Sequence, residues 1–335
     1  MKNSKIILLI ALMTVSAFAQ SKVGTTAANF LTIPVGPRAS AMGGAVVALS
    51  NDATGLFWNA ASISRLPKSE FAVSYSEWFV GTKYNWIGLA YKLDENNSFG
   101  ISINQLDYGE EEITTEASPQ GTGANWSASD MALGITYARN LTDRFSVGAT
   151  MKYIHQQIYH ETANAFALDI GLLFYTQVDG LRLGMNITNF GTEMQMAGKD
   201  LFQRIDIDYK PSSGNNENIA GALSTDSWTL PLYFTVGLGY DVIKSSDWLV
   251  STGLDAVYPN NQTTFLNAGG EVVWNDMISF RGGYHSIMKS ESLDKWSAGV
   301  GVKYDFGPFY TKIDYSYNDY KFFKEISKVS LSIGF

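Results

Sequence analysis

The feature that most constrains this chain is a two-residue alternation of apolar side chains with small or polar ones, which recurs through residues 69–335. From Leu232 to Tyr240, every second residue is apolar or aromatic, and threonine and glycine occupy much of the other face. Successive side chains of a strand point to opposite faces of its sheet. Because a second face of small and polar residues suits the inside of a barrel, the pattern predicts an all-β chain that forms an antiparallel β-barrel.

Counting such segments gives about fourteen strands, and an even number is expected for a single-chain outer-membrane barrel. The strands are predicted near residues 70–78, 83–93, 98–107, 129–139, 144–156, 163–175, 181–189, 229–241, 247–258, 263–274, 277–285, 293–304, 308–317 and 325–335. The connections provide a second test. Those predicted for one side are all short, whereas the two longest, 108–128 and 190–228, fall on the other side. Outer-membrane barrels alternate short periplasmic turns with longer outside loops in this way.

The amino terminus has the features of an export signal. Lys2 and Lys5 precede an apolar run over residues 6–17, and Ala17 and Ala19 form an A-x-A cleavage site. We therefore expect a signal peptide over residues 1–19, cleaved after Ala19. The sequence contains no cysteine, which excludes a lipoprotein anchor and a disulfide framework. No later apolar run approaches the roughly 18 residues of a transmembrane helix.

The carboxyl end also indicates the outer membrane. Val329, Leu331, Ile333 and Phe335 share one face of the last predicted strand. A terminal phenylalanine after such residues is similar to the signal read by the outer-membrane assembly machinery, and we assign this role to Phe335. We expect the chain to lie in the outer membrane of a Gram-negative bacterium, in contact with its lipid, where only a closed barrel can satisfy the backbone hydrogen bonds of strands.

Composition supports a barrel and excludes several other classes. Aromatic residues make up 13% of the chain and charged residues only 17%, and the net charge of -8 argues against nucleic acid as a partner. We find no set of residues typical of nucleophilic catalysis, so we expect neither an enzyme nor a cofactor. Aromatic residues at predicted strand ends are expected to form girdles at the membrane interfaces: Trp78, Trp86, Trp228, Tyr258, Trp274, Tyr284, Trp296 and Tyr304.

Three groups of residues are candidate ligand sites. His155 and His160, next to Glu161, lack the spacing of a helical zinc motif, and we interpret them as a polar rim. The acidic residues 110–112, together with Glu116, lack the spacing of a calcium loop and are expected to form a solvated loop. The Gly-Thr-Gly sequence at 121–123 does not follow a strand and open a helix, as a phosphate-binding loop would. We therefore predict no metal site.

Residues 36–61 differ from the rest of the chain, since they are too rich in glycine and alanine for a strand and too rich in Asn, Asp and Trp for an idle linker. The stretch contains a characteristic set of residues: Gly36, Arg38, Ala39, Met42, Gly43, Gly44, Ala45, Asn51, Asp52, Ala53, Trp58, Asn59 and Ala61. This set resembles the amino-terminal stretch of the PorV/PorQ family of outer-membrane proteins, which share the barrel-and-hatch plan of the long-chain fatty acid transporters. The departures are Ala60, where the family has proline, and Ser62, where it has glycine. The resemblance implies an N-terminal plug inside the lumen over residues 20–68 and a transmembrane barrel over residues 69–335.

Two interpretations of the plug motif remain open at this point. Asn51, Asp52 and Asn59 could satisfy buried backbone groups of irregular structure while Trp58 packs, or the same residues could take part in gating or ligand binding. Arg38 and Asp52 are the only charged residues within 36–61.

Charges on the predicted wall are placed by strand parity. The residues expected to face the lumen are Lys92, Lys152, Asp169, Arg182, Asp255, Glu271, Arg281, Lys303, Asp314 and Lys328. They could form ion pairs that hold a filled lumen shut, or they could line a polar conduit. Four of them are carboxylates, so Arg38 is expected to find an acidic partner on the wall.

The family resemblance implies a non-enzymatic component of type IX protein secretion. Such a barrel receives secreted proteins through their carboxyl-terminal signal domains and passes them to the attachment machinery, so that cargo and other secretion subunits are the implied partners. The loops 108–128 and 190–228 would be the receiving surfaces.

The alternative is a transporter of hydrophobic small molecules, which also uses a plugged barrel. Loop 190–228 is rich in polar residues and offers only a short apolar patch around Met194, Met196, Leu201 and Phe202, which favours a protein partner over a capture groove for apolar ligands. A purely structural surface barrel is the third interpretation.

Overall fold

The computed structural model describes residues 24–205, 219–289, 292, 294–321 and 325–335. The expected signal peptide and its cleavage after Ala19 lie outside the described residues. Within these ranges, no helix has the length and hydropathy needed to cross a membrane.

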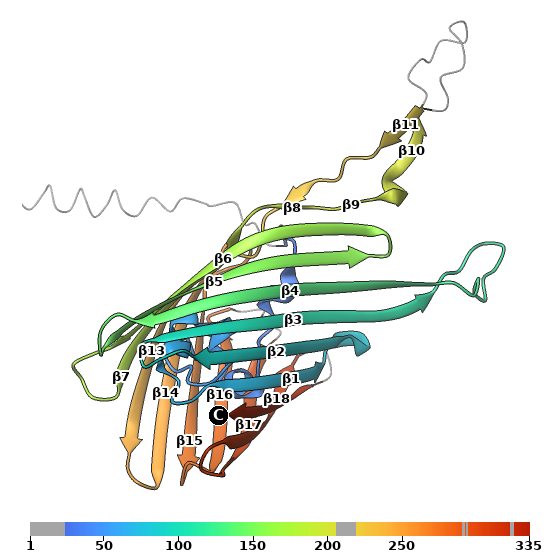
Figure 1. Cartoon of the computed structure of the whole chain (residues 1–335). Coiled ribbons are helices and arrows are strands. Elements are labelled where there is room, and N and C mark those ends of the chain that lie inside the picture. Colours follow the sequence, from blue (N-terminus) through green and yellow to red (C-terminus); the bar gives the residue numbers. More distant parts are fainter. Residues whose placement is uncertain (1–23, 206–218, 290–291, 293, 322–324) are drawn as a thin grey trace, which may run out of the picture.

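Long antiparallel strands form most of the chain (Figure 1). Their sheet has 15 strands, and without the two-residue β9 the remaining 14 form a closed ring. They are β1 (Glu70–Glu77), β2 (Lys83–Lys92), β3 (Asn97–Glu112), β4 (Asn125–Asn140), β5 (Phe145–Ile158), β6 (Glu161–Tyr175), β7 (Leu181–Gly191), β13 (Tyr233–Lys244), β14 (Trp248–Pro259), β15 (Phe265–Trp274), β16 (Ile278–Ile287), β17 (Asp294–Asp305), β18 (Tyr310–Tyr320) and β19 (Ile326–Gly334). Each strand pairs with its neighbours in this order, and β1 closes the ring on β19 from Glu70↔Gly334 to Ser76↔Lys328. The predicted barrel of about fourteen strands is confirmed.

The polarity of the wall is inverted relative to a soluble protein. In β19, Val329 and Leu331 are 44% and 41% exposed, whereas Ser330 and Ser332 between them are 8% and 6% exposed. Apolar side chains therefore face outward and small polar ones inward, which is the arrangement that a lipid environment favours. The predicted girdle position of Trp86 is wrong: this side chain is only 1% exposed and belongs to the buried apolar cluster, because it shares the inward parity of β2 with Tyr84.

The two ends of the barrel differ. The turn end, which carries the connections 93–96, 141–144, 176–180, 245–247, 275–277 and 306–309, has only short links. The loop end carries 113–124 and 192–232, the two longest connections. The predicted loop 108–128 is wrong at both margins, since the β3–β4 ladder continues to Glu112↔Asn125 beyond a bulge between Asp107 and Glu110.

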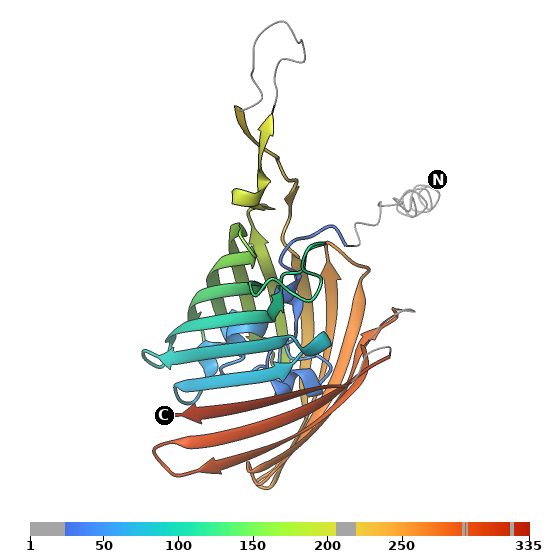
Figure 2. The ribbon, with the colours of Figure 1, turned by 90° about the vertical axis from the view of Figure 1, so that its right-hand side faces the viewer.

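Connection 192–232 builds an extension that projects beyond the ring (Figure 2). It contains β8 (Met194–Gln195), β9 (Ala197–Gly198), η4 (Lys199–Leu201), β10 (Phe202–Ile205), β11 (Ile219–Ala222) and β12 (Ser227–Trp228). Strand β8 pairs with β12, β9 pairs with β6, and β10 pairs with β11. Here the extension means the described residues of this connection.

The N-terminal segment, residues 24–68, contains short helices only. They are η1 (Asn29–Thr32), α2 (Pro37–Ala41), α3 (Gly55–Trp58) and η2 (Ala60–Arg65), and a further turn η3 (Phe79–Gly81) follows β1. Helix α2 begins with proline, whose fixed φ suits a first helical position. Every residue from 35 to 50 is buried. Helix α2 touches β16–β19 and η2 touches β2–β6, so the segment contacts opposite parts of the ring.

Glycines of the wall explain how this backbone packs so closely. A Cβ atom at Gly184, Gly253 or Gly269 would overlap the backbone of Val47, Ala45 or Met42. The small second face of the strands therefore accommodates the main chain of the N-terminal segment. Gly43 itself has φ of 66°, and a Cβ there would lie 2.8 Å from the backbone N of Tyr284, so both its conformation and its surroundings require glycine.

Candidate functional site between the N-terminal segment and the wall

Arg38 joins the N-terminal segment to the barrel. Helix α2 positions its side chain, which is 6% exposed. Its Nε donates to Glu271 Oε1 at 3.0 Å and its Nη2 donates to Glu271 Oε2 at 2.7 Å, while Nη1 lies 3.5 Å from Asp52 Oδ2. This contact with Glu271 of β15 is a bidentate salt bridge, in which the planar guanidinium donates two hydrogen bonds to one carboxylate.

The same carboxylate continues the chain of charges into the wall. Arg281 lies directly opposite Glu271 in the β15–β16 ladder, and its Nε donates to Glu271 Oε1 at 2.6 Å. Its Nη1 donates to Asp314 Oδ1 of β18 at 2.5 Å. The alternating series Asp52, Arg38, Glu271, Arg281 and Asp314 is what we call the ion network. All five side chains are buried, and each has a partner of opposite charge, as buried charges require.

A second carboxylate, which the sequence analysis missed, also holds the N-terminal segment. Glu70 is fully buried at the start of β1 and accepts a hydrogen bond from the Ala53 backbone N–H at 3.2 Å. Tyr310 OH donates to it at 2.5 Å, and Lys312 Nζ lies 3.8 Å away. Lys312 shares strand parity with Asp314, so the alternation of β18 contained a signal for its inward position.

The ammonium group of Lys312 also interacts electrostatically with Asp52. Burial by itself would raise the pKa of the Asp52 carboxyl, but the charges of Lys312 and Arg38 and hydrogen bonds from Thr54 hold that pKa below its ordinary value. The carboxylate is therefore ionised beside Arg38.

The remaining predicted lumen charges fall into separate groups. Lys152 Nζ lies 2.5 Å from Asp169 Oδ2 and donates to Asn189 Oδ1 at 2.9 Å. Asp255 Oδ2 accepts from the Val47 backbone N–H at 3.0 Å, and its Oδ1 has no hydrogen-bond partner among the described residues.

The other members lie farther from the ion network. Arg182 pairs with Asp241, and Lys303 lies 2.5 Å from the exposed Asp276 at the turn end. Lys328 donates to the Pro34 carbonyl, and Lys92 is half-buried. The structure thus joins Glu271, Arg281 and Asp314 into one cluster and leaves the rest outside it.

Polar residues of the motif at 36–61 mostly bind backbone groups. Asn59 Nδ2 donates to the carbonyls of Val47 at 2.8 Å and Leu172 at 3.0 Å, and its Oδ1 accepts from Ala61 N–H. Trp58 Nε1 donates to the Val35 carbonyl at 2.9 Å. Asn51 is exposed, whereas Gly36, Met42, Gly43 and Gly44 are buried.

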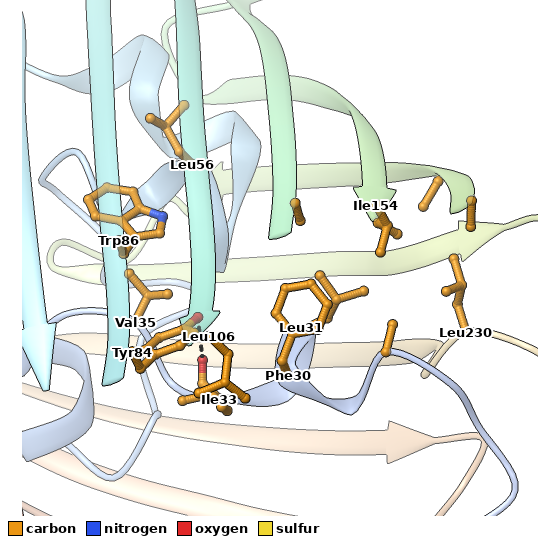
Figure 3. Close-up of a cluster of buried hydrophobic side chains, with 14 of the residues drawn as sticks. Phe30, Leu31, Ile33, Val35, Leu56, Tyr84, Trp86, Leu106, Ile154 and Leu230 are labelled. Atoms are coloured by element: carbon orange, nitrogen blue, oxygen red, sulfur yellow. Dashed lines mark hydrogen bonds between the residues drawn. The ribbon is translucent and has the colours of Figure 1, made fainter. Parts of the chain in front are cut away.

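Apolar packing holds the first part of the segment. Phe30, Leu31, Ile33 and Val35 lie against inward side chains of β2, β3 and β5, which include Trp86, and Tyr84 OH donates to the Ile33 carbonyl at 3.3 Å (Figure 3). Burial of large apolar side chains contributes about 1.5–3 kcal/mol each.

A cavity of about 430 Å³ lies between the segment and the strands toward the loop end. It was not predicted from the sequence, because its lining comes from positions scattered over the whole chain. The lining residues are Leu31, Thr32, Ile33, Pro34, Gly44, Val47, Phe57, Trp58, Trp78, Phe79, Lys152, Asn186, Thr188, Asn189, Tyr233, Thr235, Val257, Gln262, Phe265, Asn267, His285, Ser286, Lys289, Ser292 and Tyr320.

The two histidines near Glu161, His155 and His160, each contact a polar side chain. His155 Nδ1 lies 2.7 Å from Asn164 Oδ1, and His160 Nδ1 lies 2.7 Å from Asp200 Oδ2. The part of the chain that the structure describes contains no group of three or more His, Cys, Asp and Glu side chains that could hold a metal ion.

Several solved structures share this fold at low sequence identity. The CymD monoaromatic hydrocarbon channel aligns with a TM-score of 0.56 and 13% identity over 90% of this chain and 96% of that one. The toluene transporter TodX of Pseudomonas putida aligns with a TM-score of 0.53 and 13% identity, over 89% and 96%. A FadL homologue of Pseudomonas aeruginosa gives a TM-score of 0.51 and 12% identity, over 89% and 96%. At this identity the likeness shows the fold alone. No curated protein sequence matches the chain.

The family comparison is more specific. The model for the type IX secretion system protein PorV matches residues 16–209, which include the N-terminal segment with Arg38, the wall strands β1–β7 and the extension as far as β10. This is more than half of the chain, and it agrees with the motif at residues 36–61 and with the closed barrel. The chain is therefore an outer-membrane β-barrel that belongs to the PorV family of type IX secretion proteins.

Proposed function

We propose that this barrel receives secreted proteins at its loop end, recognises their carboxyl-terminal signal domains and passes them to the surface-attachment machinery. The extension is the observation that carries the proposal. It projects beyond the ring, and its β10–β11 hairpin exposes Phe202 at 63%, Ile205 at 41% and Ile219 at 42%. Exposed aromatic and aliphatic side chains on a projecting hairpin suit contact with another protein better than contact with water.

The test is secretion in cells. Removing the chain should leave cargo with a carboxyl-terminal signal domain in the periplasm, and the wild-type chain should restore its export. The double substitution Phe202→Ser and Ile219→Ser should reduce export while the barrel still assembles. Leu141→Ser is the matched control, since Leu141 is 53% exposed in a turn at the opposite end. Normal export by the double variant would contradict a receiving role for the hairpin.

The N-terminal segment is proposed to act as a plug inside the lumen, in a chain whose signal peptide is removed after Ala19 and whose barrel begins near residue 69. Contacts at both ends support this assignment. Ala27 N–H donates to the Thr229 carbonyl at 3.0 Å near the loop end, and Arg65 Nη1 donates to the Asp143 carbonyl at 2.8 Å at the turn end. Between them the ion network ties Arg38 to β15. A segment held at both ends and in the middle would have to move before anything large could pass.

A second candidate function is transport of hydrophobic small molecules. The aromatic lining of the cavity favours it, together with the hydrocarbon channels that share the fold. Uptake of labelled toluene by liposomes that contain the purified protein tests it. Protein-dependent uptake without any secretion defect in cells that lack the chain would favour this second function over the first.

A further inference from the structure

The cavity toward the loop end has an unusual balance of charge for this chain. Among the described residues, no Asp or Glu lines it, although the net charge of the chain is -8. Lys152 at its wall is neutralised by Asp169 at 2.5 Å. Lys289 has no carboxylate partner among the described residues: its Nζ donates to Gln262 Oε1 at 2.8 Å, which uses one of the three ammonium protons. The described part of the lining therefore carries one positive charge that no described carboxylate balances.

An amide adds a hydrogen-bond donor to the same lining. Asn267 of β15 accepts a hydrogen bond from the Ser286 backbone N–H through Oδ1 at 2.9 Å, and this bond fixes the orientation of the amide. Its Nδ2 makes no hydrogen bond with any described residue. Since Asn267 is only 7% exposed, few positions remain from which this donor can be satisfied, and the cavity that it lines is one of them. Ser286 and Lys289 line the cavity beside it, so one wall gathers donors.

Aromatic rings form another part of the lining. Trp78 and Phe79 lie with ring centroids 4.8 Å apart, and Tyr320 contacts both, at 5.9 Å and 5.0 Å. Such a cluster is a rigid apolar surface that can receive an aliphatic or aromatic side chain. Phe79 follows β1, Tyr320 ends β18 and Lys289 follows β16, so all three belong to the loop end. A ligand would therefore enter from the end that bears the extension, with Trp58 of the N-terminal segment as part of the floor.

We propose that the cavity binds a carboxylate joined to an apolar body, and that its occupant is the free carboxyl terminus of a secreted chain. This inference rests on the proposed function. A carboxylate complements the charge of Lys289 and accepts a hydrogen bond from the Asn267 amide, whereas a neutral hydrocarbon would leave that charge unbalanced and the amide donor unpaired. The side-chain amides and hydroxyls of Gln262, Thr188 and Thr235 in the lining suit peptide groups and have no counterpart in a hydrocarbon ligand.

The test uses the full chain purified in detergent and three probes. N-acetyl-Ser-Val-Phe with a free carboxylate should bind at least about tenfold more tightly than its carboxyl-terminal amide, as a hydrogen bond to a charged group predicts. Titration calorimetry measures both affinities. Equal affinities would overturn the proposal. Binding of 3-phenylpropanoate without any binding of the free-acid tripeptide would overturn the peptide occupant and assign the cavity to small free acids.

Two variants test the named residues. Asn267→Asp keeps the acceptor for Ser286 N–H, removes the donor and adds a negative charge, so it should abolish binding of the free-acid peptide. Lys289→Met removes the charge at similar length and should erase the preference over the amide. Asn125→Asp and Lys244→Met make the same changes at exposed positions outside the cavity. Both control variants should retain the preference for the free-acid peptide over its amide.

Barrel assembly and the proposed export function are each tested by a separate measurement. Heat-modifiable migration on a gel shows whether each variant has formed its barrel. If Asn267→Asp does not assemble, the Lys289→Met result decides by itself, and an unchanged preference in that variant contradicts the inference. Cells that need the chain for export, combined with no carboxylate preference in vitro, would refute the carboxylate site and leave the proposed function standing.

Discussion

Arg38→Ala should loosen the N-terminal segment while the barrel stays intact. The substitution removes the two hydrogen bonds to Glu271, at 3.0 Å and 2.7 Å, and the 3.5 Å contact with Asp52. Breaking a buried ion pair costs about 3–5 kcal/mol, chiefly because a charge is left without a partner. Here Glu271 would keep Arg281 at 2.6 Å and Asp52 would keep its hydrogen bonds from Thr54. The expected cost is therefore near the lower limit, about 3 kcal/mol, or roughly a hundredfold rise in the loosened population.

The structure also predicts a rank order. Glu271→Ala leaves Arg38 with only the 3.5 Å contact to Asp52 and the Leu49 carbonyl at 3.4 Å, so its cost should approach about 5 kcal/mol. Arg38→Lys keeps the charge but loses the bidentate geometry and should fall between the wild type and Arg38→Ala. Arg139→Ala is the control, because Arg139 is exposed on β4.

Entry of a bulky antibiotic into intact cells measures the loosening, and heat-modifiable migration confirms that the barrel has assembled. Permeability should rise in the order wild type, Arg38→Lys, Arg38→Ala, Glu271→Ala, with Arg139→Ala like the wild type. Unchanged permeability in Arg38→Ala would refute the idea that the ion network holds the segment. Loss of assembly would instead mean that the segment belongs to the folding core of the barrel.

Three further predictions concern assembly, topology and packing. Deleting Phe335, which is 52% exposed and whose backbone N–H donates to the Ser69 carbonyl at 2.9 Å, should leave less heat-modifiable protein in the outer-membrane fraction, and undiminished assembly would contradict its role as an assembly signal. A tag inserted after Pro119 in connection 113–124 should be labelled on intact cells and one at Asn96 should not, and the reverse pattern would invert the proposed orientation. Gly43→Ala should destabilise the packed segment by about 1–3 kcal/mol through a φ of 66° and overlap with β16, lowering the temperature of the gel shift, and an unchanged temperature would show that the segment can rearrange there.

Local pattern determined the architecture of the wall. The alternation in β19 and the other wall strands depends only on neighbours along the chain, and lipid outside the ring makes the apolar face the exposed one. The number of strands and the inward position of Asp314, Arg281 and Glu271 could therefore be predicted from the sequence. The short turns could be predicted as well, because they are the gaps between successive alternating segments. The margins of connection 108–128 could not be predicted, because the β3–β4 ladder beyond Asp107 contains a bulge that breaks the parity.

Only the tertiary structure decided which charges meet. Strand parity placed four carboxylates on the inner face as possible partners of Arg38. Three of them have other partners: Asp169 pairs with Lys152, Asp255 accepts a hydrogen bond from the Val47 backbone N–H, and Asp314 pairs with Arg281. Glu271 is the one that lies within reach of Arg38, and strand register together with the depth of helix α2 sets that position. The cavity is likewise a product of the fold, since Asn267, Lys289 and the rings near Trp78 come from separate strands and turns. A local sequence pattern cannot specify the distance between residues so far apart in the chain. Closure of the ring and packing of the N-terminal segment against it set that distance.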